Sequence, residues 1–354
     1  MSQYCISAGS WDFRGGDRGL TLLDCADGHA VPVRSFLSEL NVGTQCVDTF
    51  RKIIYLPEEM TGGDKRTGSY IAAVKYDLER GELSLLSRKR TYGCNASFCT
   101  LDKSGRYLLV THHDEGTPDG DKDPNTATVV LFRVEEDGTI GEIADYYAVH
   151  GDRPPHLHSV YAAPAEDLYI VSDKGLDRVY TFAVDRENGK LIFLHEGIAE
   201  ADTNPRYGVF HPSLPLFYGN NEKKPVLYIW TYTADGSLSR SEAIPAVEGR
   251  DGEKIHASDI RIHPSGKKLY LSLRGADLIV TFDILEDGTL AKCGERACGK
   301  GPRGTLIDPE GTLFFSANRD DNKVEVIRIE EDGSLGETIS EADVPVPGNL
   351  AVLL

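Results

Sequence analysis

Short runs of apolar or alternating residues recur along the whole chain. Clear examples are residues 129–134, 279–284 and 324–329, which are rich in β-branched and aromatic side chains. This length and composition are typical of strands, and no long segment shows the 3.6-residue period of an amphipathic helix. The pattern therefore predicts an all-β protein.

A turn signal follows most of these runs and repeats seven times. In it an acidic residue or Asn stands one or two positions before a glycine, and the glycines lie 45 to 57 residues apart at Gly28, Gly81, Gly138, Gly189, Gly236, Gly288 and Gly333. Asp-Gly and Asn-Gly favour tight hairpins, because Gly adopts positive φ without steric cost. A second turn and strand come earlier in each unit, as at residues 104–110 and 264–271. About four strands per unit of ~50 residues are typical of a β-propeller blade.

Seven such units predict a seven-bladed β-propeller with four-stranded antiparallel blades, formed by residues 1–354 as one domain. The C-terminal run 349–354 resembles the first strand of a unit that has no successors. Residues 3–8, 19–24 and 31–37 supply the three missing strands. We therefore expect the last blade to be closed by both chain termini, which hides the sheet edges from other chains.

Two positions per unit, always sixteen residues apart, carry an unusual set of residues. The strand-start positions begin the innermost strands and hold Gly43, Ser97, His158, Arg206, Ser258 and Arg303. The strand-end positions end the second strands and hold Glu59, His113, Lys174, Glu222, Arg274 and Arg319. A constant offset through a hairpin places both sets at one end of the central channel. Cations and carboxylates converging there favour a pocket for an anionic small molecule over solvated strand ends or ion pairs between blades.

Several segments that carry these positions have recognisable motifs. They are residues 154–159 (Pro-Pro-His-Leu-His-Ser) with 172–178, residues 204–212, residues 220–222, residues 263–266 with 272–275, and residues 301–304 with 317–319. These segments resemble the seven-bladed lactonase family, which includes enzymes of the 6-phosphogluconolactonase and carboxy-cis,cis-muconate lactonising types. The resemblance spans all seven units and implies that His158, Arg206, Glu222 and Arg274 form the active site. Lys174 replaces an apolar residue of the family pattern, and beside two arginines it suits a phosphate or an extra carboxylate.

The resemblance implies a lactonase that hydrolyses an anionic sugar lactone, with 6-phosphogluconolactone as the leading candidate. His158 or Glu222 would act as general base on water, and a near-neutral pKa favours His158. Arg206 and Arg274 would hold the anion and stabilise the oxyanion. Further substrate contacts would come from His113, Lys174, Arg303 and Arg319. The alternatives are a muconate-type cycloisomerase that uses the same pocket and a non-catalytic binding scaffold.

The composition excludes some classes of binding partner and indicates a cellular compartment. With 38 Lys and Arg against 56 Asp and Glu, the net charge of -18 argues against nucleic acid and anionic membrane surfaces as partners. No apolar run reaches the ~18 residues of a membrane span, and the N-terminus does not resemble a signal peptide. Seven cysteines without a CxxC spacing argue against a disulfide framework or a zinc cluster and indicate the cytoplasm. No motif indicates a metal or nucleotide cofactor.

Two longer loops and three polar residues lie near the strand-end positions. Residues 114–125 alternate Asp and Asn as calcium ligands do, but the glycine does not fit an EF-hand, so a solvated loop is favoured. Residues 61–68 contain three glycines and are interpreted as a surface loop. Each of three polar residues follows a strand-end position by three places in the sequence: Asp177, Asp277 and Asn322. We expect them to cap turns by hydrogen bonds from side chain to backbone.

Overall fold

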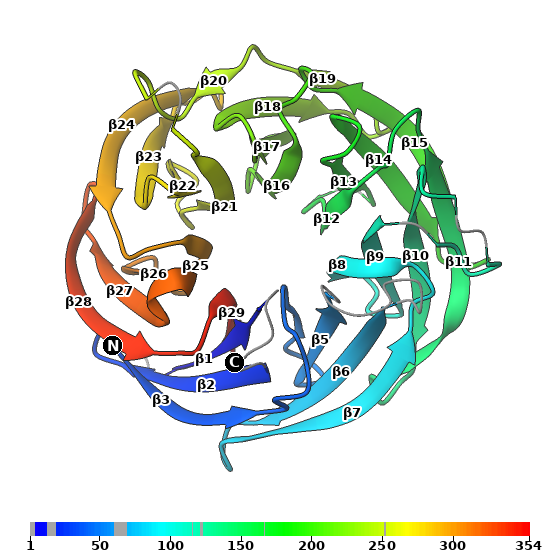
Figure 1. The fold of residues 1–354 in the computed structure, drawn as a ribbon, viewed down its shortest axis with the longest axis horizontal. Helices are drawn as coiled ribbons and strands as arrows, with labels where there is room; N and C mark the ends of the chain where they lie inside the picture. Colours follow the sequence, from blue (N-terminus) through cyan, green and yellow to red (C-terminus); the bar gives the residue numbers. More distant parts are fainter. Residues whose placement is uncertain are drawn as a thin grey trace.

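Seven antiparallel sheets surround a central axis, as Figure 1 shows. The computed structural model describes residues 4–12, 19–59, 69–114, 116–120, 123–165, 167–250 and 253–354. Within each sheet the strands follow one another from the axis outward. The predicted all-β, seven-bladed propeller with four-stranded blades is therefore confirmed.

Six blades are built from consecutive strands, with the innermost strand first. Blade 1 contains β4 (Cys46–Asp48), β5 (Ile53–Glu58), β6 (Tyr70–Asp77) and β7 (Glu82–Arg90). Blade 2 contains β8 (Cys94–Leu101), β9 (Tyr107–Asp114), β10 (Thr126–Val134) and β11 (Ile140–His150). Blade 3 contains β12 (Leu157–Ala162), β13 (Tyr169–Asp173), β14 (Arg178–Asp185) and β15 (Lys190–Ile198).

The next three blades follow the same order. Blade 4 contains β16 (Pro205–Phe210), β17 (Leu216–Asn221), β18 (Val226–Tyr232), and an outer strand in two pieces, β19 (Leu238–Arg240) and β20 (Ile244–Pro245). Blade 5 contains β21 (His256–Ile262), β22 (Lys268–Arg274), β23 (Leu278–Ile284) and β24 (Leu290–Ala297). Blade 6 contains β25 (Pro302–Ile307), β26 (Leu313–Asn318), the short 3-10 helix η2 (Arg319–Asp321), β27 (Lys323–Ile329) and β28 (Leu335–Asp343).

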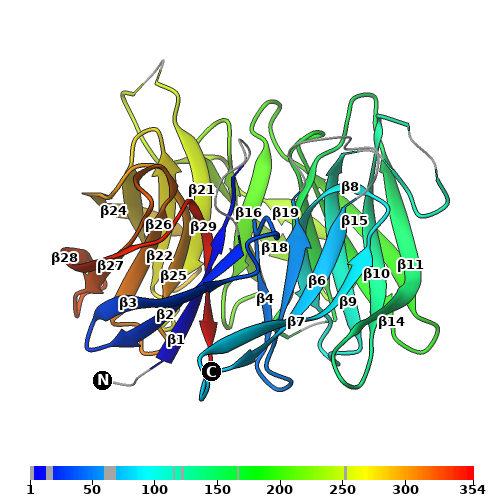
Figure 2. The ribbon, with the colours of Figure 1, turned by 60° about the horizontal axis from the view of Figure 1, so that its bottom comes forward.

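Blade 7 joins the two ends of the chain. Its strands are β29 (Pro347–Leu353), β1 (Tyr4–Ser10), β2 (Gly19–Ala26) and β3 (His29–Phe36). The innermost strand β29 pairs with β1 in antiparallel register, with Cys5 opposite Leu353, and Figure 2 shows the two strands side by side. The predicted closure by both termini is confirmed. It leaves the inner edge of β1 paired instead of open.

The repeated glycines sit in the turn that follows the third strand of each blade, and all seven have positive φ, between 61° and 87°. Several of these turns also accept a hydrogen bond from the preceding blade. The hydroxyls of Tyr55, Tyr218 and Tyr270 donate to the carbonyls of Gly138, Gly288 and Gly333, at 3.0, 2.8 and 2.7 Å. One sequence signal therefore fixes both the hairpin and part of the contact between blades.

The three expected capping residues do more than close their own turns. Asp177, Asp277 and Asn322 all have φ near 55°, and their side chains accept backbone N–H groups at the entry to the next blade. Asp177 accepts from Asp202 and Asn204 at 2.9 and 2.8 Å, Asp277 from Gly301 at 2.9 Å, and Asn322 from Val346 at 2.8 Å. The predicted side-chain to backbone bonds are present, but they join successive blades.

Two of the predicted loops fall partly or wholly outside the described residues. The glycine-rich loop 61–68 lies wholly outside them. Of the acidic loop 114–125, Glu115, Asp121 and Lys122 lie outside them. In the described part of the acidic loop, Asp123 accepts the backbone N–H of Asn125 at 2.9 Å. Across the described ranges, no helix combines the length and apolar character needed to span a membrane.

Candidate active site

A break in strand pairing occurs at the strand-start position of five blades. Between β12 and β13 the register shifts between Leu157 and Ser159, so His158 has no partner across the ladder. Equivalent shifts occur at Ser97, Arg206, Ser258 and Arg303. A β-bulge re-aims the side chain of its extra residue. The bulges thus explain why residues at the start of the innermost strands turn toward the axis.

Glu222 lies at the centre of one group of these side chains, which we call the Glu222 cluster: His113, His158, Lys174, Arg206, Glu222 and Arg274. One carboxylate oxygen, Oε1, lies 2.5 Å from Nη2 of Arg274 and 3.8 Å from Nε of Arg206. The other oxygen pairs with the ammonium of Lys174. These three cations come from blades 5, 4 and 3. The structure therefore brings together residues that are 100 positions apart in the chain (174 to 274).

The charges of the Glu222 cluster are strongly perturbed. Burial alone would raise the pKa of Glu222, but Arg206, Lys174 and Arg274 outweigh it and hold this pKa far below its ordinary value. Burial, and then the neighbouring Arg206, lowers the pKa of Arg274 to about 10. Burial also lowers the pKa of Lys174, although Glu222 opposes the shift. At neutral pH the carboxylate is ionised, and three cations share one negative charge.

Arg206 is only 1% exposed and is fixed on several sides. Its Nη1 donates to the carbonyl oxygen of Ser258 in blade 5, and its guanidinium lies 4.2 Å from the ring centroid of Tyr207. Burial opposes the charge of Arg206, but Tyr207 and Glu222 together keep its pKa above the ordinary value. Arg206 is therefore a permanently charged group held in one place.

Two histidines complete the Glu222 cluster. The rings of His113 and His158 lie 4.7 Å apart, and His158 also packs edge-on against Tyr207 at 4.9 Å. Burial, together with nearby cations, lowers the pKa of both rings well below the ordinary value. Among the described residues, Nδ1 of His158 is buried without a hydrogen-bond partner. The near-neutral pKa expected for His158 is thus not found, but a neutral imidazole with an unpartnered nitrogen is able to accept a proton.

A second group lies on the opposite side of the axis and contains Trp11, Glu59, Arg303 and Arg319. Nη2 of Arg303 lies 3.5 Å from Oε2 of Glu59, and its guanidinium lies 3.7 Å from the centroid of the Trp11 indole. Arg319 approaches the same indole at 5.7 Å and pairs with Asp320 at 2.8 Å. We call this the Trp11 group.

Trp11 was not predicted from the sequence. It directly follows β1, the second strand of blade 7, as Glu59 follows β5 and Glu222 follows β17. It is thus the strand-end residue of the seventh blade. The sixteen-residue offset could not reveal it, because the first two strands of that blade come from opposite ends of the chain.

The two serines at strand-start positions serve contacts between blades. Ser97 donates from its hydroxyl to the carbonyl of Leu157 in blade 3 at 2.7 Å. Ser258 supplies the carbonyl that binds Arg206. All eight predicted site residues thus lie in one of the two axial groups. Over the described ranges, no three His, Cys, Asp or Glu side chains are arranged to hold a metal ion.

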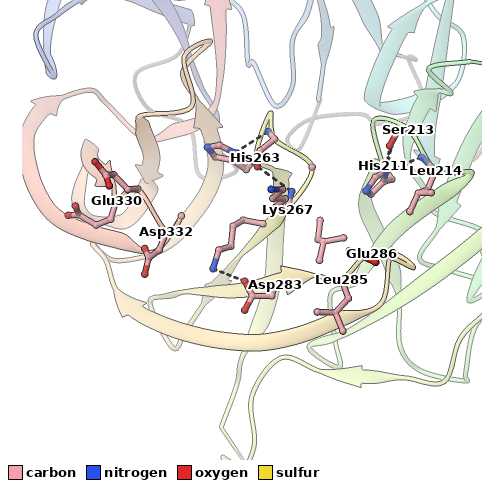
Figure 3. A pocket seen from close by; sticks show the side chains of 16 residues that line it. His211, Ser213, Leu214, His263, Lys267, Asp283, Leu285, Glu286, Glu330 and Asp332 are labelled. Atoms are coloured by element: carbon pink, nitrogen blue, oxygen red, sulfur yellow. Dashed lines mark hydrogen bonds and ion pairs between the residues drawn. The ribbon is translucent and has the colours of Figure 1, made fainter.

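A groove of about 790 Å³ lies elsewhere and is shown in Figure 3. It includes His211, just after the end of β16, whereas Arg206 stands near the beginning of the same strand. Its histidines are engaged in local bonds: His211 accepts from the backbone N–H of Leu214 at 2.9 Å, and Nε2 of His263 contacts the carbonyl of Gly311 at 2.9 Å. Its Lys268 pairs with Asp283 at 2.7 Å. We therefore place the candidate site at the axis, where charged side chains from several blades converge.

The protein is thus a seven-bladed β-propeller, and charged side chains from several blades form a polar site on its axis. Residues 46–352 match the family described as "Lactonase, 7-bladed beta-propeller". The chain therefore belongs to the seven-bladed β-propeller lactonase family, and the predicted resemblance is confirmed.

Individual relatives support this assignment. A 6-phosphogluconolactonase of Formosa agariphila is 29% identical over 277 residues, which cover 74% of this chain and 75% of the relative. The 6-phosphogluconolactonase of Bacillus subtilis is 26% identical over 288 residues and 78% of each chain. The periplasmic gluconolactonase of Pseudomonas aeruginosa superposes with a TM-score of 0.89 at 18% identity, covering 100% of this chain and 99% of its own. The last similarity concerns the fold alone.

Proposed function

We propose that this protein hydrolyses an anionic sugar lactone at the Glu222 cluster. The observation that carries the proposal is the excess of positive charge in a largely buried cluster, since Arg206, Lys174 and Arg274 share the single carboxylate of Glu222. Such a site attracts an anionic substrate and stabilises negative charge that develops on it. The names of the two bacterial relatives, both 6-phosphogluconolactonases, support a phosphorylated sugar lactone.

In this proposal His158 is the general base. Its neutral imidazole removes a proton from water as the water oxygen bonds to the lactone carbonyl carbon. The carbonyl oxygen becomes an oxyanion, which Arg206 and Arg274 stabilise. Collapse of the tetrahedral intermediate breaks the ring C–O bond and gives the hydroxy acid. Lys174 and His113 contact the substrate beside these groups, and Arg303 and Arg319 contact it from the Trp11 group.

Glu222 suits a different role from that of a base. Whereas Nδ1 of His158 is buried without a hydrogen-bond partner among the described residues, both carboxylate oxygens of Glu222 already contact cations. Its contacts with Arg206, Lys174 and Arg274 instead orient the groups that bind the substrate. We therefore assign Glu222 a positioning role and His158 the proton transfer.

The cytoplasm remains our proposal for the compartment. It is supported by the seven cysteines, all of them free thiols, because unpaired cysteines are typical of reducing compartments. The Pseudomonas relative, by contrast, is named as periplasmic.

A substrate panel tests the proposed reaction. Purified protein is assayed with 6-phosphoglucono-δ-lactone, glucono-δ-lactone and 3-carboxy-cis,cis-muconate, with correction for spontaneous ring opening. We expect the highest kcat/KM with the phosphorylated lactone and no turnover of the muconate. Turnover of the muconate alone would instead indicate a cycloisomerase, and no turnover of any compound would favour a binding scaffold.

A further inference from the structure

Two buried carboxylates face the axis, and their surroundings differ sharply. Glu222 contacts three cations. Within the described ranges, the ion-pair contact of Glu59 is with Arg303 alone, at 3.5 Å, although the side chain of Glu59 is the more buried of the two, at 10% exposure against 17% for Glu222. The proposed function uses Glu222 and leaves Glu59 without a role.

The backbone around Glu59 is arranged to hold this side chain toward the axis. Its carbonyl oxygen accepts from Nδ2 of Asn41 at 2.7 Å, and Oδ1 of the same Asn41 accepts the backbone N–H of Asp12 at 3.0 Å. Asn41 thereby ties Glu59 to the segment that carries Trp11. The strand-start residue of this blade is Gly43, and a Cβ atom there would lie 2.5 Å from Oε2 of Glu59. The absent side chain provides the space that the carboxylate occupies.

Burial of Glu59 works against the charged form of its carboxyl. Burial raises its pKa, while Arg303, Arg206 and Lys174 oppose this shift. These three cations belong to blades 6, 4 and 3, and Glu59 directly follows the second strand of blade 1 as Glu222 directly follows that of blade 4. Two carboxylates whose pKa values are pushed in opposite directions commonly divide acid and base or electrostatic roles between them.

We propose that Glu59 is a catalytic residue, the general acid that protonates the leaving ring oxygen during lactone hydrolysis. This inference rests on the proposed function. As the ring C–O bond breaks, its electron pair moves to the ring oxygen, which takes the proton from the Glu59 carboxyl. The resulting carboxylate is stabilised by Arg303. Glu59 regains a proton from solvent, and His158 releases to solvent the proton that it took from the attacking water.

The experiment compares two substrates that differ in how much they need the acid. One is the sugar lactone, whose ring oxygen leaves as an alkoxide. The other is the matching thiolactone, in which sulfur replaces the ring oxygen. A thiolate leaves without protonation, so loss of a general acid affects the lactone alone. For Glu59→Gln we expect kcat on the lactone to fall about 10²- to 10³-fold. On the thiolactone, kcat should stay within about threefold of wild type.

Glu58→Gln is the matched control. Glu58 is the neighbouring buried carboxylate, but both of its oxygens pair with Arg88, at 2.6 and 2.8 Å. We expect this variant to change both substrates by the same factor. Glu59→Asp provides a second variant that keeps a carboxylic acid, and its kcat on the lactone should lie between wild type and Glu59→Gln.

Each contrary result has a distinct meaning. Equal losses on both substrates in Glu59→Gln, or an unchanged rate on the lactone, would overturn the role of Glu59 while leaving the lactonase intact. Wild-type protein that hydrolyses neither substrate would overturn the proposed function itself, and the inference with it.

Discussion

Nη2 of Arg274 lies 2.5 Å from Oε1 of Glu222, so a guanidinium of blade 5 and a carboxylate of blade 4 meet at the axis. The two residues are 52 positions apart in the chain, one blade length. Residues at the same repeated sequence position in successive blades are therefore neighbours in space. Their contact also means that neither residue can be changed without altering the charge balance of the other.

Replacing Arg274 by alanine should remove most of the lactonase activity. We expect kcat to fall about 10²- to 10³-fold, because the oxyanion loses one of its charged donors. Far-UV circular dichroism should remain that of wild type. Arg296→Ala is the matched control, since Arg296 pairs with Glu325 at 3.0 Å away from the axis. An undiminished rate in Arg274→Ala would remove this residue from the mechanism.

Replacing Glu222 by glutamine should destabilise the protein by an amount that depends on pH. At pH 7 we expect a loss of about 3 kcal/mol in the free energy of unfolding, since one buried and two partly buried cations lose their partner. The folded-state pKa is far below the ordinary value of 4.5. The stabilisation is therefore complete above 4.5 and is lost as the pH falls toward the folded-state pKa.

Urea denaturation of wild type and Glu222→Gln across this range measures the effect. The difference between the two proteins should shrink by about 2 kcal/mol between about pH 6 and pH 3, at ~1.4 kcal/mol per pKa unit. A difference that is constant over the whole range would show that the carboxylate of Glu222 is not held by its cations.

The general base determines the acid limb of the pH profile. His158 must be neutral to accept a proton, and burial together with nearby Arg206 lowers its pKa below 6.5. The neutral form therefore persists to lower pH than for an exposed histidine. We expect the acid limb of kcat/KM to have its midpoint below pH 6.5. An acid limb with its midpoint above 6.5 would contradict the assignment of His158.

A substitution at His158 provides the complementary result. His158→Asn keeps a polar side chain of similar reach but no proton acceptor of comparable strength. The expected loss in kcat is about 10²- to 10⁴-fold, and the acid limb should disappear from the residual activity. Retention of the limb would assign it to another group.

The indole of Trp11 should stabilise Arg303 through its π face. Both side chains are buried, so the interaction is expected to contribute about 1 to 2 kcal/mol. A double-mutant cycle with Trp11→Leu and Arg303→Met, followed by urea denaturation, measures this coupling. The cycle of Trp11→Leu with Arg319→Met is the control, because that guanidinium lies farther away at 5.7 Å. Equal coupling energies in the two cycles would argue against a specific contact with Arg303.

The fold could be predicted because its signals are local and repeated. Positive φ at a hairpin requires glycine or a small polar residue, and the seven turn glycines meet this demand in every blade. The shared blade was predictable because the C-terminal run lacked partners that only the N-terminus could supply. These inferences needed the sequence pattern alone.

The sequence predicted which residues form the site, but not which of them contact one another. A constant offset identified Lys174, Glu222 and Arg274 as equivalent positions, yet it carried no information on which of them would pair. The bulge that turns His158 out of the ladder has no signature in the sequence. Trp11 lies where the chain closes on itself, so no regular spacing indicated it. The contrast between Glu59 and Glu222 arises from burial and neighbours, which only the folded chain defines.

The most direct test of the proposed site is a crystal structure of the protein with 6-phosphogluconate, the product of the proposed reaction. We expect electron density for this anion at the axis, within hydrogen-bond distance of Arg206, Lys174 and Arg274. Density confined to the groove beside His211, or to any surface away from the axis, would contradict it.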